Sequence, residues 1–313
     1  MKDDGTVSEG GFEENDDWSS VTAGPDIIVR AGQTLPIEGG RSYSVNSITI
    51  EAGGTLLIEN QLREWTMIRA AGTVEVLGQI VVNPMPSKPG VPEDTVEKTA
   101  PDGTVLRQVF RYRNGGTGGQ GGGYPRASNG TRGPGAPGGL GYGGGGGGGA
   151  SNDNRRGGNQ TPGHAANGRT GGAPRSDRRE PGGAGGNGGE SGAFGDGGLL
   201  FIRAEAAFKG GGVVTINGAP GHPGSAGQNS GTGGGGGGGS AGYPGGAFVL
   251  LCIGDIEQPE VRKTGGAGGG GGTAGRSRST YPGNNGNEHG DPGAGGPEGH
   301  AGKFVFIPGP WVN

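Results

Sequence analysis

Three stretches of this chain consist almost entirely of glycine and small polar residues: 114–198, 218–246 and 264–302. Each one starts and ends at a short apolar run of the kind that forms a β-strand. Glycine accounts for 85 of the 313 residues, far above ordinary usage. A chain with this composition is either a flexible linker or a structure in which backbones approach more closely than side chains allow.

The spacing of the glycines favours the second possibility. Within the excursions glycine recurs at every third position, as in Gly218, Gly221, Gly224 and Gly227, and again in Gly290, Gly293, Gly296, Gly299 and Gly302. Three residues per turn is the period of the polyproline-II helix, which has no internal hydrogen bonds. If one face of such a helix carries only glycine, neighbouring helices can exchange backbone hydrogen bonds. The pattern therefore predicts a bundle of polyglycine-II helices.

Collagen and disordered linkers are the competing interpretations. Collagen needs long unbroken Gly-X-Y runs rich in proline, whereas proline is only 22 of 313 residues here. Against disorder, the apolar residues are confined almost entirely to the borders of the excursions. Oligoglycine runs also recur at 143–149, 233–239 and 268–272, and each is followed by a similar pair of small residues. A spacer needs no such repeats, but ordering glycine costs much backbone entropy, so a linker stays open as an alternative.

The first third of the chain carries a different repeat, with a period of about twenty residues. A glycine turn followed by alternating apolar residues occurs at 31–37, 52–58 and 71–76, which is typical of strands with one buried face. Further strands are expected at 48–50, 80–82, 105–113, 199–208, 213–217, 247–256 and 303–308. The sequence thus predicts an all-β fold without significant α-helix. A short β-solenoid-like N-terminal part is followed by a polyglycine-II helical bundle anchored by β-strands.

This division gives three regions. Residues 1–25 hold seven acidic residues among the first 17, with Phe12 and Trp18, and are interpreted as a docking arm, although a frayed terminus is an equal alternative. Residues 26–113 form the β-solenoid-like domain, and 114–313 form the glycine-rich bundle. The lone Cys252 lies in an apolar run and is expected to be a buried, inert thiol.

Oligoglycine excursions framed by β anchors resemble the polyglycine-II sandwich modules of bacteriophage tail-fibre adhesins and related virion proteins. The resemblance covers roughly 114–313 and rests on the oligoglycine cores at 143–149, 233–239 and 268–272. It implies a virion protein made in the host cytoplasm. The chain start has neither the basic residues nor the apolar stretch of a secretory signal, and no run approaches transmembrane length, so membrane insertion is not expected.

In those adhesins, loops at the tips of the glycine helices bind a host receptor, so the corresponding candidates are the non-glycine islands of the excursions. Aromatic and basic residues in these islands suit a surface glycan or an outer-membrane protein. The candidates are Tyr124, Arg126, Arg155, Arg156, Arg178, Arg179, Tyr243, Arg276, Arg278 and Tyr281. Between Val105 and Glu180, eleven arginines and three acidic residues give a net charge of +8, which favours an anionic receptor. Alternatively, these arginines only keep a glycine-rich surface soluble.

Other functional classes have weaker support. Arg-Gly-Gly occurs once, at 156–158, so RNA or DNA binding of the arginine–glycine type is not expected. Four glutamates on the predicted solenoid, Glu51, Glu59, Glu64 and Glu75, are interpreted as solvated rather than as a glycosidase pair. A weak metal candidate comprises His289, Asp291 and His300. No catalytic motif or phosphate-binding loop accompanies them, so no cofactor and no enzyme activity are expected.

The sequence therefore predicts a non-enzymatic virion protein, most plainly a tail-fibre or tail-tip adhesin. We expect a homotrimer or a higher assembly that contacts other virion proteins through its N-terminal part. The alternative is a decoration protein of the capsid, collar or tail whose glycine islands bind nothing. A bacterial surface protein would need an export signal that the chain start does not display.

Overall fold

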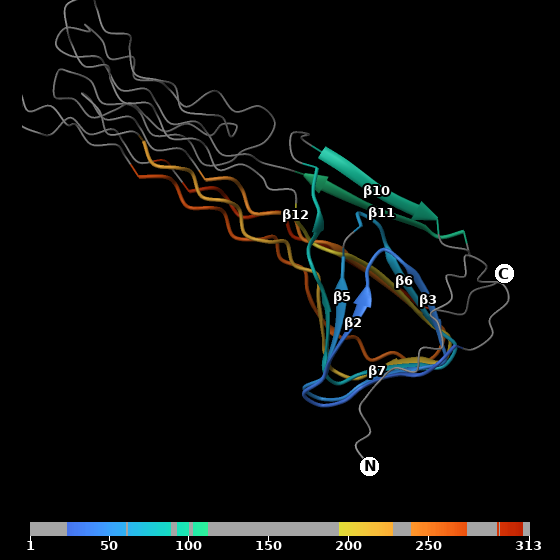
Figure 1. Ribbon diagram of the computed structural model, residues 1–313. Helices are drawn as coiled ribbons and strands as arrows, with labels where there is room; N and C mark the ends of the chain where they lie inside the picture. The colour runs from blue at the N-terminus through green and yellow to red at the C-terminus, as the bar shows by residue number, and fades with distance from the viewer. Residues whose placement is uncertain are drawn as a thin grey trace, which may run out of the picture.

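The computed structural model describes residues 24–60, 62–88, 93–99, 103–111, 194–227, 239–273, 293 and 295–308. This part of the chain is all-β, without any helix, and most of its strands form three parallel sheets. The all-β prediction is thus confirmed. Figure 1 shows the sheets enclosing one compact region, from which the later part of the chain extends to one side.

Each sheet collects strands that lie far apart in the sequence. Sheet 1 has the order β1 (Ile27–Val29), β4 (Ile48–Ile50), β7 (Thr73–Val76) and β14 (Ala207–Lys209). Sheet 2 has the order β2 (Thr34–Glu38), β5 (Thr55–Glu59), β8 (Gln79–Val82), β15 (Val213–Thr215) and β17 (Glu260–Arg262). Sheet 3 has the order β3 (Ser42–Val45), β6 (Thr66–Ala70), β13 (Leu199–Ala204), β16 (Ala247–Cys252) and β18 (Lys303–Pro308).

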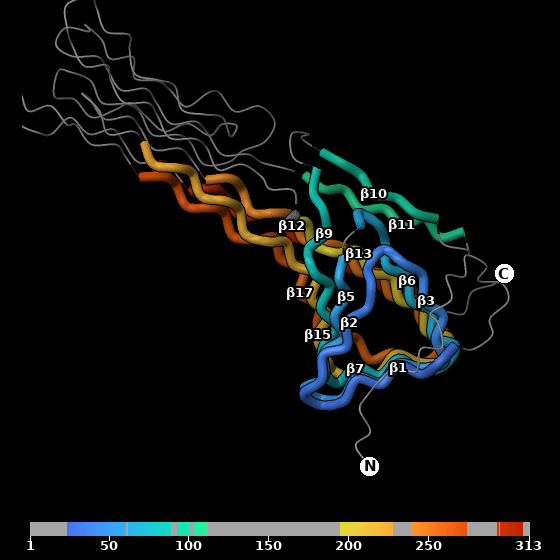
Figure 2. The backbone as a smooth tube through the Cα atoms, viewed as in Figure 1, coloured from blue at the N-terminus to red at the C-terminus, as the bar shows by residue number. Residues whose placement is uncertain are grey.

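The chain visits the three sheets in the same order each time, so the strands form layers. The first layer is β1, β2 and β3, and the second is β4, β5 and β6. The third contains β7, β8 and β13, and the fourth contains β14, β15 and β16. The fifth consists of a single bridge at Ile256, followed by β17 and β18. Figure 2 shows these layers running from blue to orange along the stack.

Strict alternation explains which side chains form the core. One residue in two points inward from each strand, and these apolar residues stack on their counterparts in the next layer. Ile37, Ile58 and Val82 in sheet 2 are examples of such buried residues. The central cluster joins inward residues of all three sheets, including Cys252, whose burial agrees with the predicted inert thiol. Burial also raises the pKa of this thiol.

Four strands lie outside the three sheets. β10 (Glu93–Thr99) and β11 (Val105–Arg111) form an antiparallel hairpin, and β9 (Met85–Pro86) pairs with β12 (Phe194–Asp196). A second apolar cluster, with Trp65, Leu106, Phe110 and Phe201, joins the hairpin to the outer face of sheet 3. The predicted strand 105–113 is therefore a hairpin strand and does not extend the stack.

The strands predicted at 31–37, 52–58 and 71–76 are all present, as β2, β5 and β7, but only the first two stack on each other. Residues 31–37 and 52–58 lead into β2 and β5, which pair with Thr34 opposite Thr55. Residues 71–76 instead form β7 in sheet 1, and the next strand of sheet 2 is β8. Strands from both sides of residue 113 share the sheets, because β13, β14 and β15 pair with β6, β7 and β8.

Candidate functional site

Each glycine-rich excursion lies on a connection from a strand of sheet 2 to a strand of sheet 3, and the described parts of the second and third excursions leave the stack at one corner between these sheets. They lie on the connections from β8 to β13, from β15 to β16 and from β17 to β18. In the first two layers the connection at this corner is short. Residues 39–41 join β2 to β3, and residues 60–65 join β5 to β6. We call this position the glycine corner. The orange segments that run away from the sheets in Figure 1 start there.

Four described segments run outward from the glycine corner or return to it. The outbound segments are 217–227 and 263–273, and the return segments are 239–246 and 295–302. The two outbound segments lie side by side in parallel, with backbone N–H groups at 216, 218, 221, 224 and 227 donating to carbonyls at 262, 264, 267, 270 and 273. The donor–acceptor offset is 46 residues in every case. The pairing register of sheet 2 thus continues into the glycine segments. The spacing between hydrogen-bonding residues changes from two residues, as in a β-strand, to three.

Return segments lie antiparallel to the outbound ones. Gly296 and Gly299 donate their N–H groups to the carbonyls of Gly269 and Gly266, at 2.8 and 2.9 Å. Tyr243 donates its N–H to the carbonyl of Ala219 at 2.9 Å. The return segments also bond to each other, since Gly242 donates to the carbonyl of Pro297. Each described glycine segment therefore bonds to at least two others.

The positions of the glycines follow from these neighbours. In segment 263–273, a Cβ at Gly266 or Gly269 would overlap the carbonyl of Ala219 or His222 in the other outbound segment. A Cβ at Gly268 would instead overlap Gly296 in a return segment. A segment with close neighbours on two sides needs glycine at two of every three positions, which accounts for this oligoglycine run. Gly270 meets nothing within 4 Å.

Tyr243 is the one predicted receptor contact whose side chain the structure describes. It is only 3% exposed, and its ring lies so close to Gly195 that any Cβ there would overlap it. The His222 ring meets it edge-on, with 6.1 Å between ring centroids. The predicted receptor contact at Tyr243 is therefore corrected: this side chain packs the base of the glycine segments and does not face a ligand.

The remaining candidates lie outside the described residues. These are Tyr124, Arg126, Arg155, Arg156, Arg178, Arg179, Arg276, Arg278 and Tyr281, together with the metal candidates His289 and Asp291. His300 is described and exposed, and its carbonyl accepts a hydrogen bond from Gly245. Within the described residues, no three His, Cys, Asp or Glu side chains gather as they would to hold a metal ion.

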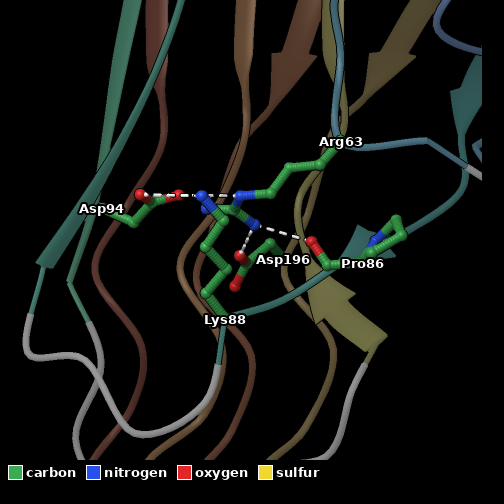
Figure 3. Close-up of polar contacts among 5 residues, drawn as sticks. All are labelled: Arg63, Pro86, Lys88, Asp94 and Asp196. Atoms are coloured by element: carbon green, nitrogen blue, oxygen red, sulfur yellow. Dashed lines mark hydrogen bonds and ion pairs between the residues drawn. The ribbon is translucent and has the colours of Figure 1, made fainter.

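A charged cluster around Arg63 fastens the hairpin and β12 to the stack (Figure 3). Arg63 Nε lies 2.9 Å from Asp94 Oδ2 in β10, and Nη1 lies 2.5 Å from Asp196 Oδ2 in β12. Nη1 also donates to the carbonyl of Pro86 at 2.6 Å. The guanidinium sits 4.7 Å from the centre of the Phe110 ring, a cation–π distance. One side chain thus bridges three segments that are separate in sequence.

The electrostatics of this cluster keep Asp94 ionised. Burial raises the pKa of Asp94, but hydrogen bonds from Arg63 and Lys88 outweigh it, so the pKa lies below its ordinary value. Lys88 is exposed and its Nζ lies 3.3 Å from Asp94 Oδ1. The arginine, with its fixed planar donors, is suited to this bridging role. Nothing in its sequence neighbourhood predicts the cluster, because two of its partners come from strands 31 and 133 residues away.

A groove of about 550 Å³ opens beside the cluster, between the 63–65 turn and the hairpin. Its lining mixes charges of both signs with Trp65 and a threonine: Arg63, Glu64, Trp65, Lys88, Thr95, Val96, Glu97 and Lys98. The indole Nε1 of Trp65 is buried without a hydrogen-bond partner in the described part of the chain. Three cations and two carboxylates line the groove, and one of the cations, Arg63, is already paired with Asp94 and Asp196.

Comparison with protein-family models, with curated proteins and with solved structures gave no match to this chain. Among the described residues, no helix is long and apolar enough to cross a membrane.

Proposed function

We propose that the three-sheet part is a β-solenoid and that the glycine segments form a bundle of polyglycine-II helices projecting from it. Support for the solenoid comes from the layers, since the chain visits sheets 1, 2 and 3 repeatedly in one order. Support for the bundle comes from the three-residue spacing of the hydrogen bonds and from glycines at the points where backbones meet. The proposed solenoid includes β13 to β18, because strands from both sides of residue 113 share its sheets.

The function we propose is that of a non-enzymatic bacteriophage virion protein, a tail-fibre or tail-tip adhesin. The observation that carries it is that the described segments of the second and third excursions run out from one corner and bond to each other in a constant register. Such a bundle is stiffened by backbone hydrogen bonds and holds its far end away from the solenoid. This is the form expected of a projecting receptor-binding element. The resemblance to polyglycine-II adhesins gives the biological setting.

We assign receptor binding to the remaining non-glycine islands of the excursions, with Tyr124, Tyr281 and the arginines named above. The net charge of +8 between Val105 and Glu180 suits an anionic lipopolysaccharide or another phosphate-bearing surface polymer. Each contact is weak, and the copies on one particle multiply it. The protein is expected in the virion as a homotrimer or larger assembly, attached to other virion proteins through its N-terminal part.

The second candidate is a structural decoration protein. One observation favours it: the described receptor candidate, Tyr243, is buried and packs the base of the glycine segments. If the other islands also serve packing, the bundle is a rigid spike without a ligand.

The deciding experiment compares particles carrying the full chain with particles in which residues 151–180 are replaced by a short linker. Adsorption to host cells and binding to extracted lipopolysaccharide are measured, together with particle yield. A second test variant is full-length and has Arg155, Arg156, Arg178 and Arg179 changed to Gln. It keeps the glycine pattern, so it separates the loss of these side chains from the loss of the segment. Lost adsorption with normal yield in both variants supports the adhesin. Unchanged adsorption in both would overturn it and favour the decoration protein.

A further inference from the structure

The stack of layers has one covered end and one open end. In the first layer most inward side chains are buried, with Tyr43 3% and Val45 0% exposed, and Leu35 is partly buried. In the fourth layer Phe248 and Leu250 are also fully buried. Phe304 and Phe306 occupy the same ladder positions one layer later, yet they are only partly buried. Together with Ile256 and Val261 they form an apolar surface, which we call the open end.

A free strand edge borders the open end. β18 is the last strand of sheet 3, and no strand in the described residues pairs with its outer edge. Phe248 and Phe304 stack with 5.3 Å between ring centroids, which continues the core up to this edge. An edge strand with apolar side chains on both faces is a template for another extended segment.

The outer face of β18 adds a small groove of about 140 Å³ between β18 and β11. Val305 and Ile307 line it from β18, and the half-exposed Val105 lines it from β11. Its charged residues are Lys303 and Arg107, whose Nε lies 3.8 Å from Glu97 Oε2, and no carboxylate lines the groove itself. A segment added along β18 would therefore place alternate side chains into this groove and onto the open end. Acidic residues in that segment would meet the two cations.

Residues 1–23, which the structure does not describe, have the required chemistry. They combine seven acidic residues with one lysine, and they contain Phe12 and Trp18 as apolar anchors six positions apart. In an extended segment, an even separation puts both rings on the same face. The segment joins the chain at Gly24, next to β1 in the first layer, at the opposite end of the stack from β18.

We infer that residues 1–23 of a second copy bind along β18 and cover the open end. Within one copy, the segment starts four strand spacings from β18, about 19 Å along the stack. In a neighbour arranged head to tail, the first layer faces the open end, so the segment begins beside its binding surface. The contact uses two different surfaces and is heterologous, so it builds a ring or an open stack. This inference does not depend on the receptor-binding role.

The test uses mixed full-length protein. Equal amounts of unlabelled and isotope-labelled chains are unfolded together, refolded, and treated with a carbodiimide, which joins lysine amines to carboxylates. Mass spectrometry then reads which copies are joined. We expect links between Lys303 of one copy and acidic residues at positions 3–17 of another. Lys209, exposed on sheet 1, serves as the control lysine and should give no such link.

Two variants keep the Lys303 amine and the acidic residues but remove the contact. Val305→Asp places a charge in the groove, and Trp18→Ala removes an anchor that lies outside the described residues. Each should lower the yield of inter-copy links about tenfold or more and shift the mass from light scattering toward the monomer. Circular dichroism checks that Val305→Asp is folded. Links found only within one copy, no links at Lys303, or full assembly of Trp18→Ala would each overturn the inference.

Discussion

Arg63 Nη1 lies 2.5 Å from Asp196 Oδ2, although the two residues are 133 positions apart and the longest glycine-rich excursion separates them. Both side chains are shielded from water, with Arg63 11% and Asp196 0% exposed. The pair therefore fastens β12, at the C-terminal end of that excursion, to the 63–65 turn of the second layer.

Loss of the Arg63 guanidinium should destabilise the fold strongly. Arg63→Met keeps the apolar stem but leaves Asp94 and Asp196 in a shielded site without their shared arginine. Removing one partner of a buried ion pair costs about 3–5 kcal/mol of unfolding free energy. Urea unfolding monitored by circular dichroism measures this change. The control is Arg107→Met, whose exposed guanidinium is 3.8 Å from Glu97 and should contribute under about 1 kcal/mol. Equal effects of the two variants would contradict the assignment.

Two adjacent glycines should respond in opposite directions to the same substitution. Gly269→Ala places a Cβ against the carbonyl of His222 and pushes two glycine segments apart, at a cost of about 1–3 kcal/mol. Gly270→Ala meets open space, and it should stabilise by about 0.4–1 kcal/mol because the unfolded chain loses freedom. Thermal unfolding of the two variants gives the comparison. If both substitutions are neutral, the segments do not pack as described.

The strands were predictable from sequence, whereas their assignment to sheets was only partly so. Alternating apolar residues mark 48–50, 80–82, 213–217 and 303–308 as strands, and the structure has strands at all four. Alternation cannot distinguish β7 from β8, because strands of different sheets have the same pattern. Repeat spacing therefore predicts the strand at 71–76 but does not show that it pairs in sheet 1.

Long-range polar contacts could not be predicted from the sequence. Arg63 and Asp196 meet only after the chain has formed two layers, two strands of the third layer and an excursion, and no local spacing encodes that. For Tyr243 the sequence predicted an exposed receptor contact, because an aromatic residue among glycines suggests exposure, whereas the side chain is buried. The ring fills the space above Gly195, which comes from β12 and not from its own excursion. Composition identifies an unusual side chain, but only the tertiary neighbours decide whether it is buried.

The carboxylate of Asp94 should make stability fall in acid. Its pKa in the folded state is below the ordinary value, so the stabilisation is present at neutral pH and is lost as the pH falls through the folded pKa. NMR titration of the Asp94 side chain measures that pKa directly. In Lys88→Met the pKa should rise slightly, and in Arg63→Met it should rise more. A larger rise in the lysine variant would mean that the exposed lysine is the main partner.

Tyr43 should produce the corresponding loss at alkaline pH. Its hydroxyl donates to the carbonyl of Glu38 at 2.5 Å, and burial, aided by the charge of Glu38, raises its pKa to about 12. The neutral phenol is stabilised in the folded state, so this contribution is complete below the ordinary pKa near 10 and is lost as the pH rises through 12. Urea unfolding at several alkaline pH values should show stability falling over this range. Tyr43→Phe lacks the ionising group, so it should lose about 1 kcal/mol at neutral pH with the hydrogen bond and then decline less steeply than the wild type. An identical alkaline decline in both proteins would assign the loss to other groups and contradict a buried, hydrogen-bonded phenol at this position.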